Sequence, residues 1–218
     1  MINLWWTFNN EEIVESQLWK MIKLLPPCDQ LRIRKYTRWK DRQAFLLARM
    51  IILEKQNHIG ITDRILEKIK YTKYGRPFIE NLKADFNITH SGDVIALVTA
   101  SEGKIGIDVE AINEIKIDDF KDFFSNSEFD ILEYSENRLL DFYRLWTAKE
   151  AILKADGSGL SKFVDLNLKI TQNFGEIDGK QYHFKFLDIA DGYVCCIATS
   201  RKIDLGLDIQ INLVHPKL

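Results

Sequence analysis

The chain has 218 residues, of which 46% are apolar and 28% charged, with a formal net charge of −2 at pH 7. This fits a globular protein with one large domain or two of roughly 100 residues each, and argues against a dedicated nucleic-acid-binding protein. No apolar run approaches the roughly 20 residues of a membrane helix, the start lacks a secretion signal, and the three cysteines lack metal-site spacing. We therefore expect a cytoplasmic protein that binds neither nucleic acid nor membrane.

The first hundred residues predict a strand, helices and a basic segment. Residues 2–8 read as a strand, and a helical stretch from about 11 to 25 ends at Pro26 and Pro27. The basic segment that follows leads into a helix and contains Arg32, Arg34, Lys35, Arg38, Lys40 and Arg42. A run of charges is usually a solvated face, so an anion-binding role for this segment is the alternative interpretation.

The middle of the chain predicts turns and strands. Residues 74–77 (Tyr-Gly-Arg-Pro) form a turn, and residues 86–92 run from a short strand into a second turn. Residues 94–100 are apolar enough for a strand that is buried on both faces.

An acidic pair follows on the next predicted strand, residues 104–110. Strict alternation places Ile105, Ile107 and Val109 on one face, and Gly106, Asp108 and Glu110 on the other. Two neighbouring carboxylates repel each other at pH 7 unless a cation lies between them.

A third carboxylate interrupts a predicted helix that ends near Lys154. Its apolar stripe contains Leu139, Tyr143, Trp146 and Leu153, and Glu150 falls in the middle of that stripe. A charge among apolar residues is costly without a partner. One interpretation is that the Glu150 side chain extends past the stripe to solvent or to the side chain of an arginine. The other is that Glu150 is a metal ligand or a general base.

A shift of the chain by one hundred residues reveals an internal similarity. Residues 105–110 fall on 205–210, and the other matches are Gly92 with Gly192, Val94 with Val194, Thr99 with Thr199, Gly106 with Gly206 and Asp108 with Asp208. Chance similarity between amphipathic segments is the alternative to a true repeat. The repeat predicts an α+β fold of two similar, pseudo-twofold-related halves, residues 1–102 and 103–218.

The differences between the two copies indicate one acidic site. Glu110 corresponds to Gln210, and Glu150 corresponds to Met50. Only the second half therefore keeps its acidic set, and we expect a ligand in the cleft between the halves.

The acidic residues Asp108, Glu110 and Glu150 offer hard oxygen ligands, which suit Mg²⁺ or Mn²⁺. Such an ion usually completes its shell with substrate phosphates, so phosphoryl chemistry is expected. Lys154 could neutralise a leaving phosphate, and further phosphates could be held by His90, Arg32, Arg76 and Lys149. The alternative for His90 is a histidine in a turn that bonds to the backbone. The alternative for Lys149 and Lys154 is a position on the solvated flank of a helix.

Several motifs together resemble one family. Residues 106–110 (Gly-Ile-Asp-Val-Glu), then 146–154 (Trp-Thr-Ala-Lys-Glu-Ala-Ile-Leu-Lys) and 157–160 (Gly-Ser-Gly-Leu), resemble the two-part signature of the 4′-phosphopantetheinyl transferases. Supporting blocks lie at 74–77, 86–92 and 123–128, and the resemblance is to the monomeric, surfactin-synthetase-activating (Sfp-like) type. The family fold, two similar α+β halves, agrees with the repeat.

The resemblance implies Mg²⁺-dependent transfer of the phosphopantetheine arm of coenzyme A to a serine of an acyl, peptidyl or aryl carrier protein, with release of 3′,5′-ADP. It implies metal binding by Asp108, Glu110 and Glu150, with Glu150 the preferred base and Glu110 the alternative. Lys154 would stabilise the pyrophosphate and the leaving group. Coenzyme A contacts would come from Arg32, Arg76, Thr89, His90 and Lys149. Thr89 stands where serine is commoner, and Arg76 where lysine is frequent.

Two other functions remain open from the residues. A Mg²⁺ nuclease or phosphohydrolase also uses clustered acids and a lysine. Nucleases of this kind usually carry an acid and a lysine two residues apart on one strand, and the strand with Asp108 and Glu110 has no such lysine. A non-enzymatic carrier-binding module would require the loss of one acid, and all three are present.

Overall fold

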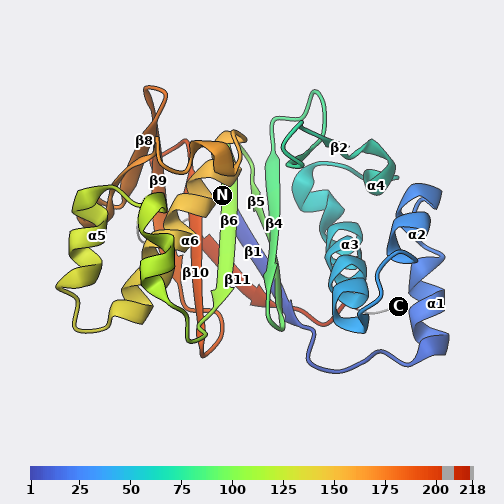
Figure 1. Ribbon diagram of the computed structural model, residues 1–218. Coiled ribbons are helices and arrows are strands. Elements are labelled where there is room, and N and C mark those ends of the chain that lie inside the picture. Colours follow the sequence, from blue (N-terminus) through green and yellow to red (C-terminus); the bar gives the residue numbers. More distant parts are fainter. Residues whose placement is uncertain (203–208, 217–218) are drawn as a thin grey trace.

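Two sheets pack face to face, and each is covered on its outer face by one long helix (Figure 1). The computed structural model describes residues 1–202 and 209–216. The N-terminal sheet has the order β11 (Ile209–Leu213), β1 (Ile2–Phe8), β5 (Val94–Ala100), β4 (Asp85–Ser91). The C-terminal sheet has the order β6 (Ile105–Ala111), β10 (Tyr193–Thr199), β9 (Lys180–Leu187), β8 (Phe174–Ile177), β7 (Asn167–Lys169).

The long helices are α3 (Trp39–Ile59) on the N-terminal sheet and α6 (Arg138–Asp156) on the C-terminal sheet. The shorter helices are α1 (Glu15–Ile22), α2 (Pro27–Ile33), α4 (Ile65–Lys68) and α5 (Asn126–Glu133), with 3₁₀ turns at Ile117–Phe123, Leu160–Lys162 and Ile170–Gln172. Strands β2 (Lys70–Tyr71) and β3 (Pro77–Phe78) form a separate small hairpin. None of the helices in the described part of the chain is long and apolar enough to cross a bilayer.

The predicted strand over residues 2–8 is confirmed, whereas the helix predicted from 11 to 25 is shorter. It is α1, and the proline pair that ends this stretch begins the next helix, because Pro27 occupies the first turn of α2. Proline is well suited there, since its missing N–H would have no partner in the helix.

Alternation along the strands builds the core between the sheets. Ile105, Ile107 and Val109 of β6 are fully buried against apolar side chains of β1 and β5. The prediction that residues 94–100 are buried on both faces is also confirmed, since Ile95 and Leu97 pack toward α3 while their neighbours face the other sheet.

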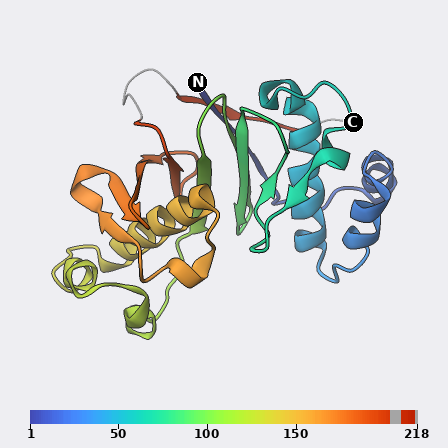
Figure 2. The same ribbon diagram turned by 90° about the horizontal axis from the view of Figure 1, so that it is seen from above.

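The two halves repeat the same arrangement, as the α+β prediction required. The strand order β1-β5-β4 beside α3 is matched by β6-β10-β9 beside α6, and Figure 2 shows the two units side by side. The part of the repeat that falls on residues 203–208, including Gly206 and Asp208, lies outside the described residues. Gln210 lies in β11.

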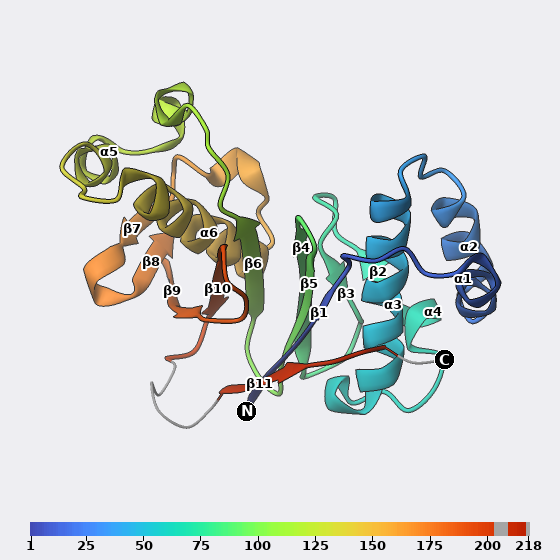
Figure 3. The ribbon, with the colours of Figure 1, turned by 90° about the horizontal axis from the view of Figure 1, so that it is seen from below.

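We propose a division of the chain between residues 102 and 103, in the turn that joins β5 to β6. One strand crosses that division. Strand β11 pairs in parallel with β1, so the end of the chain completes the N-terminal sheet (Figure 3).

Candidate functional site

Helix α6 contacts the backbone of β6 directly because residue 106 is glycine. A Cβ atom on Gly106 would lie 2.1 Å from the carbonyl oxygen of Ala151 and 2.5 Å from the nitrogen of Ala155. Both atoms are helix backbone, so a larger residue would push α6 away. The close approach places the face of β6 that carries Asp108 and Glu110 beside the last turns of α6.

Asp108 is the most buried of the predicted acidic residues. Its Oδ1 accepts hydrogen bonds from Lys154 Nζ at 2.5 Å and from Thr89 Oγ1 at 3.2 Å. Its Oδ2 is buried and has no hydrogen-bond partner among the described residues. The carboxylate therefore has one oxygen that is held in place and one whose hydrogen-bonding capacity is unsatisfied among the described residues.

Glu110 and Glu150 extend the acidic set. Burial is the main cause that raises the pKa of Glu110, to about 7, and the charges of Asp108 and Glu150 add to this effect against the hydrogen bond from Ser91. The pKa of Glu150 is also raised, by burial and then by Asp108. The three carboxylates are thus near enough to disfavour one another's ionised forms.

Lys154 supplies the positive charge of the site. Its Nζ lies 3.7 Å from a carboxylate oxygen of Glu150 in addition to the short contact with Asp108. Burial alone would lower the pKa of Lys154, but Asp108 and Glu150 outweigh burial and raise it. Lys154 is therefore an ammonium group fixed between β6 and α6.

The donor set fits a magnesium ion. Within residues 1–202 and 209–216, no three His, Cys, Asp or Glu side chains already converge as a ready-made metal site. Mg²⁺ does not require such a cage, because it keeps several waters and uses one or two protein carboxylates. The unpartnered oxygen of Asp108 and the mutual repulsion of the carboxylates are the features that a cation would relieve.

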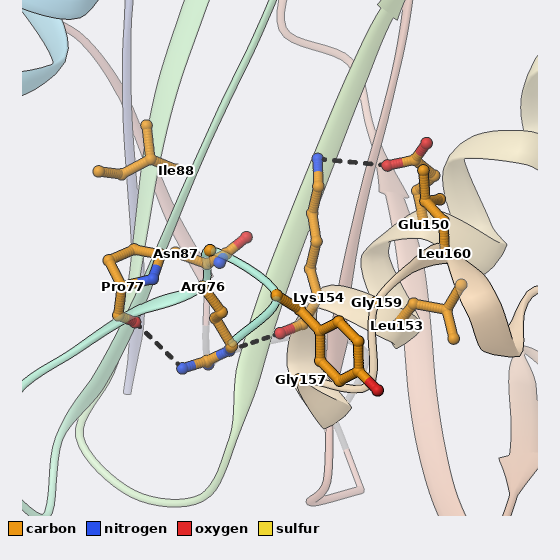
Figure 4. A pocket seen from close by; sticks show the side chains of 12 residues that line it. Arg76, Pro77, Asn87, Ile88, Glu150, Leu153, Lys154, Gly157, Gly159 and Leu160 are labelled. Atoms are coloured by element: carbon orange, nitrogen blue, oxygen red, sulfur yellow. Dashed lines mark hydrogen bonds and ion pairs between the residues drawn. The ribbon is translucent and has the colours of Figure 1, made fainter. Parts of the chain in front are cut away.

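A pocket of about 280 Å³ opens beside this acidic set, between the two halves. Residues on the turn before β3 and on β4 line one side, and the end of α6 with the turn after it lines the other (Figure 4). The lining includes Glu150 and Lys154, and a Cβ on Gly159 would lie 3.0 Å from the ring of Tyr74. The predicted cleft between the halves is therefore present next to the acidic set.

Arg76 lies in the wall of the pocket, with its guanidinium largely committed to the protein. Its Nε donates to the carbonyl oxygen of Lys154, its Nη1 to Pro77, and its Nη2 to both Asp85 and the carbonyl of Ile105. Of the five N–H groups of an arginine, one makes no hydrogen bond to any of the described residues. A coenzyme A contact from Arg76 stays a prediction, and the observed contacts hold α6 to β4 and β6.

Thr89, His90 and Arg32 lie in three different surroundings. The hydroxyl of Thr89 faces β6, whereas the exposed side chain of His90, next along β4, faces the other side of the strand. Arg32 is exposed on α2, and its guanidinium lies 4.8 Å from the ring centre of Phe45 on α3. Their proposed contacts with coenzyme A stay predictions.

Lys149 requires a correction. It was expected to bind phosphate or to lie on a solvated helix flank, but its side chain is fully buried. Its Nζ donates to Glu128 at 2.8 Å and to the carbonyl of Phe123 at 3.2 Å, and lies 5.0 Å from the ring centre of Phe163. Lys149 therefore joins α6 to α5 and lies outside the residues that line the pocket.

Sequence reasoning missed a set of polar contacts, which we call the β4–β6 ladder. Alternate side chains of β4 accept hydrogen bonds from alternate N–H groups of β6, in the pairs Asp85 with Ile105, Asn87 with Ile107, Thr89 with Val109 and Ser91 with Ala111. The signal was available, because these polar residues recur at every second position of β4, with Phe86, Ile88 and His90 between them.

Comparison with known proteins agrees with this geometry. The family model for the 4′-phosphopantetheinyl transferase superfamily matches residues 104–198, and that for a 4′-phosphopantetheinyl transferase N-terminal domain matches residues 12–102. The chain is 26% identical over 201 residues to the 4′-phosphopantetheinyl transferase Sfp of Bacillus subtilis (strain 168), covering 90% of this chain and 85% of that protein.

Two further relatives match shorter regions. The 4′-phosphopantetheinyl transferase Gsp of Aneurinibacillus migulanus is 29% identical over 74% of this chain and 70% of its own length. The 4′-phosphopantetheinyl transferase Ffp of Bacillus subtilis is 38% identical over 66% of this chain, and the match spans 62% of its own length. With adjoining family models on both halves and a fold of two similar α+β units, the chain belongs to the 4′-phosphopantetheinyl transferases and is of the Sfp-like type.

Proposed function

We propose that the protein transfers the 4′-phosphopantetheine arm of coenzyme A to a serine of an apo carrier protein, acyl or peptidyl, in a Mg²⁺-dependent reaction that releases 3′,5′-ADP. The observation that carries the proposal is the acidic set with Lys154 at the edge of a pocket between the halves. The names of the matched relatives support the transfer of phosphopantetheine.

In the proposed reaction, the serine oxygen attacks the phosphorus next to the pantetheine arm. A new O–P bond forms, the bridging P–O bond of the pyrophosphate breaks, and its electron pair leaves with 3′,5′-ADP. Glu150, which lines the pocket, accepts the serine proton directly or through water. Lys154 lies beside both acids and stabilises the charge on the leaving group.

The metal would be held by Asp108, Glu110 and Glu150. When bound, it supplies positive charge that neutralises the pyrophosphate. Asp108 is the best placed of the three, because one of its oxygens is already fixed by Lys154 and Thr89 while the other has no partner among the described residues.

The test is the intact mass of an apo carrier protein after incubation with this protein, coenzyme A and Mg²⁺, with an EDTA control. A metal-dependent gain equal to one phosphopantetheine group is expected. Release of 3′,5′-ADP separates the transferase from a nuclease or phosphohydrolase. Coenzyme A binding without any mass gain, across several carrier types, would instead indicate a carrier-binding module.

A further inference from the structure

The last rung of the β4–β6 ladder differs from the first two in what its side chain can do. Asp85 and Asn87 accept an N–H of β6 but do not contact the acidic set. Ser91 accepts the N–H of Ala111 at 3.2 Å and also donates to Glu110 Oε2 at 2.7 Å. The ladder is therefore linked to the predicted metal ligands at the end where Ser91 lies.

The hydroxyl of Ser91 has a determined orientation. A serine hydroxyl has one proton and two acceptor lone pairs. The N–H of Ala111 occupies a lone pair, so the single proton is available for Glu110. Thr89 makes the same pair of contacts one rung earlier, with the N–H of Val109 and with Asp108. Two hydroxyls thus orient two consecutive carboxylates of β6.

The turn after Ser91 is held from several sides. The hydroxyl of Tyr193 accepts the N–H of Asp93 at 3.0 Å, and Lys40 forms an ion pair with Asp93 at 2.6 Å. Gly92 has a φ of 54°, and a Cβ there would lie 2.7 Å from the hydroxyl of Tyr193. Because the turn is fixed against β10 and α3, Ser91 cannot follow Glu110 if that carboxylate moves.

Glu110 depends on this contact more than Asp108 depends on Thr89. Asp108 is also held by the ion pair with Lys154 at 2.5 Å. Glu110 is only half buried, and it lies near two like charges that would drive its carboxylate toward solvent. Hydrogen bonds from neighbouring groups orient metal-binding carboxylates and contribute to metal affinity.

On the basis of the proposed metal-dependent function, we infer that Ser91 is a positioning residue that holds the Glu110 carboxylate on the metal-facing side of β6. Its hydroxyl connects the N-terminal half, through β4, to a predicted metal ligand of the C-terminal half. Ser91 itself is not expected to contact the metal or coenzyme A.

The test is a titration of the full-length protein with Mn²⁺ in the presence of saturating coenzyme A, followed by isothermal titration calorimetry. Ser91→Ala removes the hydroxyl, and Ser91→Thr retains it. Asp85→Asn weakens the first ladder rung, which lies away from the carboxylates of the acidic set and outside the lining of the pocket, and serves as the control for general loosening of the β4–β6 contact. We expect Ser91→Ala to weaken Mn²⁺ binding roughly tenfold, with Ser91→Thr retaining the affinity and Asp85→Asn lowering only the melting temperature.

Unchanged Mn²⁺ affinity in Ser91→Ala would overturn the inference, and so would an equal loss in Asp85→Asn. A failure of the proposed function looks different, because the unmodified protein would then bind no Mn²⁺ in the presence of coenzyme A. That result would remove the metal from the proposed mechanism and the role of Ser91 with it.

Discussion

Lys154 Nζ and Asp108 Oδ1 lie 2.5 Å apart and form an ion pair that joins the last turns of α6 to β6. The aspartate end is almost completely buried, whereas the lysine side chain is 29% exposed. Removing the lysine alone would leave the buried charge of Asp108 without a partner, and an uncompensated buried charge strongly destabilises the folded state.

Lys154→Met should therefore lower the free energy of unfolding by about 2 kcal/mol, less than a fully buried pair because the lysine is partly solvated. The double variant Lys154→Met/Asp108→Asn should be more stable than Lys154→Met alone, since it also removes the buried Asp108 charge that the single variant leaves without its ion pair. Urea denaturation measures both. Equal stability of the single and double variants would show that Asp108 does not need the lysine.

Glu150→Ala should abolish transfer without loss of stability. Burial and Asp108 raise the pKa of Glu150, so its charge is disfavoured where it lies and its removal does not weaken the helix. A fall in kcat of about 10² or more is expected for a lost base, with the melting temperature nearly unchanged. The exposed Glu67→Ala on α4 is the matched control and should retain activity. A large drop in the melting temperature of Glu150→Ala would contradict the assignment.

Glu128→Gln should destabilise the protein strongly, because it leaves the ammonium of Lys149 buried without its carboxylate. A loss of about 3 kcal/mol is expected for a broken buried pair. Lys149→Met should lower stability as well, while coenzyme A affinity, measured by calorimetry, stays the same in the folded variant. If a Lys149 variant had normal stability but bound coenzyme A more weakly, the prediction that Lys149 binds a phosphate would be supported instead.

Gly106→Ala should impair both stability and transfer, because the added Cβ meets two backbone atoms of α6 that cannot move independently. A loss of about 3 kcal/mol is expected from such overpacking. Gly175→Ala is the comparison: its nearest contacts are the side-chain ends of Ile152 and Leu166, which can rotate. Thermal unfolding and transfer rates should therefore show a smaller effect for Gly175→Ala, and equal effects would argue against helix displacement.

Asp156 gives a pH-dependent prediction away from the acidic set. Burial would raise its pKa, but the hydrogen bonds from Tyr182 and Lys180 outweigh burial and lower the pKa below its usual value. A carboxylate with a lowered folded pKa contributes stability above its unfolded pKa and loses it as the pH falls through the folded value. Asp156→Asn should therefore lower the melting temperature at neutral pH, with the difference shrinking below about pH 4. A constant difference down to pH 2 would count against this.

The strand alternation and the acidic set could be read from the sequence because they follow local periodicity. The apolar face of Ile105, Ile107 and Val109 packs as predicted, and the opposite face turns Asp108 toward α6. The cleft between the halves could also be predicted, because the repeat implied two similar halves packed together, with a ligand between them. The acidic residues that only the second half keeps were expected beside that cleft.

The environment of Lys149 could not be read in the same way. Helix α6 is buried by the sheet on one side and by α5 and the preceding 3₁₀ turn on another. A single apolar stripe, as expected from the sequence, therefore does not describe which of its side chains are buried. Which partner meets a given charge on such a helix depends on distant segments. Glu128 was available in the sequence, but nothing local pairs it with Lys149.

Strand β11 affects how the N-terminal sheet folds while the chain is being synthesised. Its parallel partner is β1, so Ile2 lies beside Ile209, at opposite ends of the chain. During synthesis, this edge of β1 has no partner strand until residues 209–213 have left the ribosome. Contacts between residues so far apart in sequence form slowly. We therefore expect the N-terminal unit to remain open to chaperones and to unwanted strand pairing until β11 is available to pair with β1.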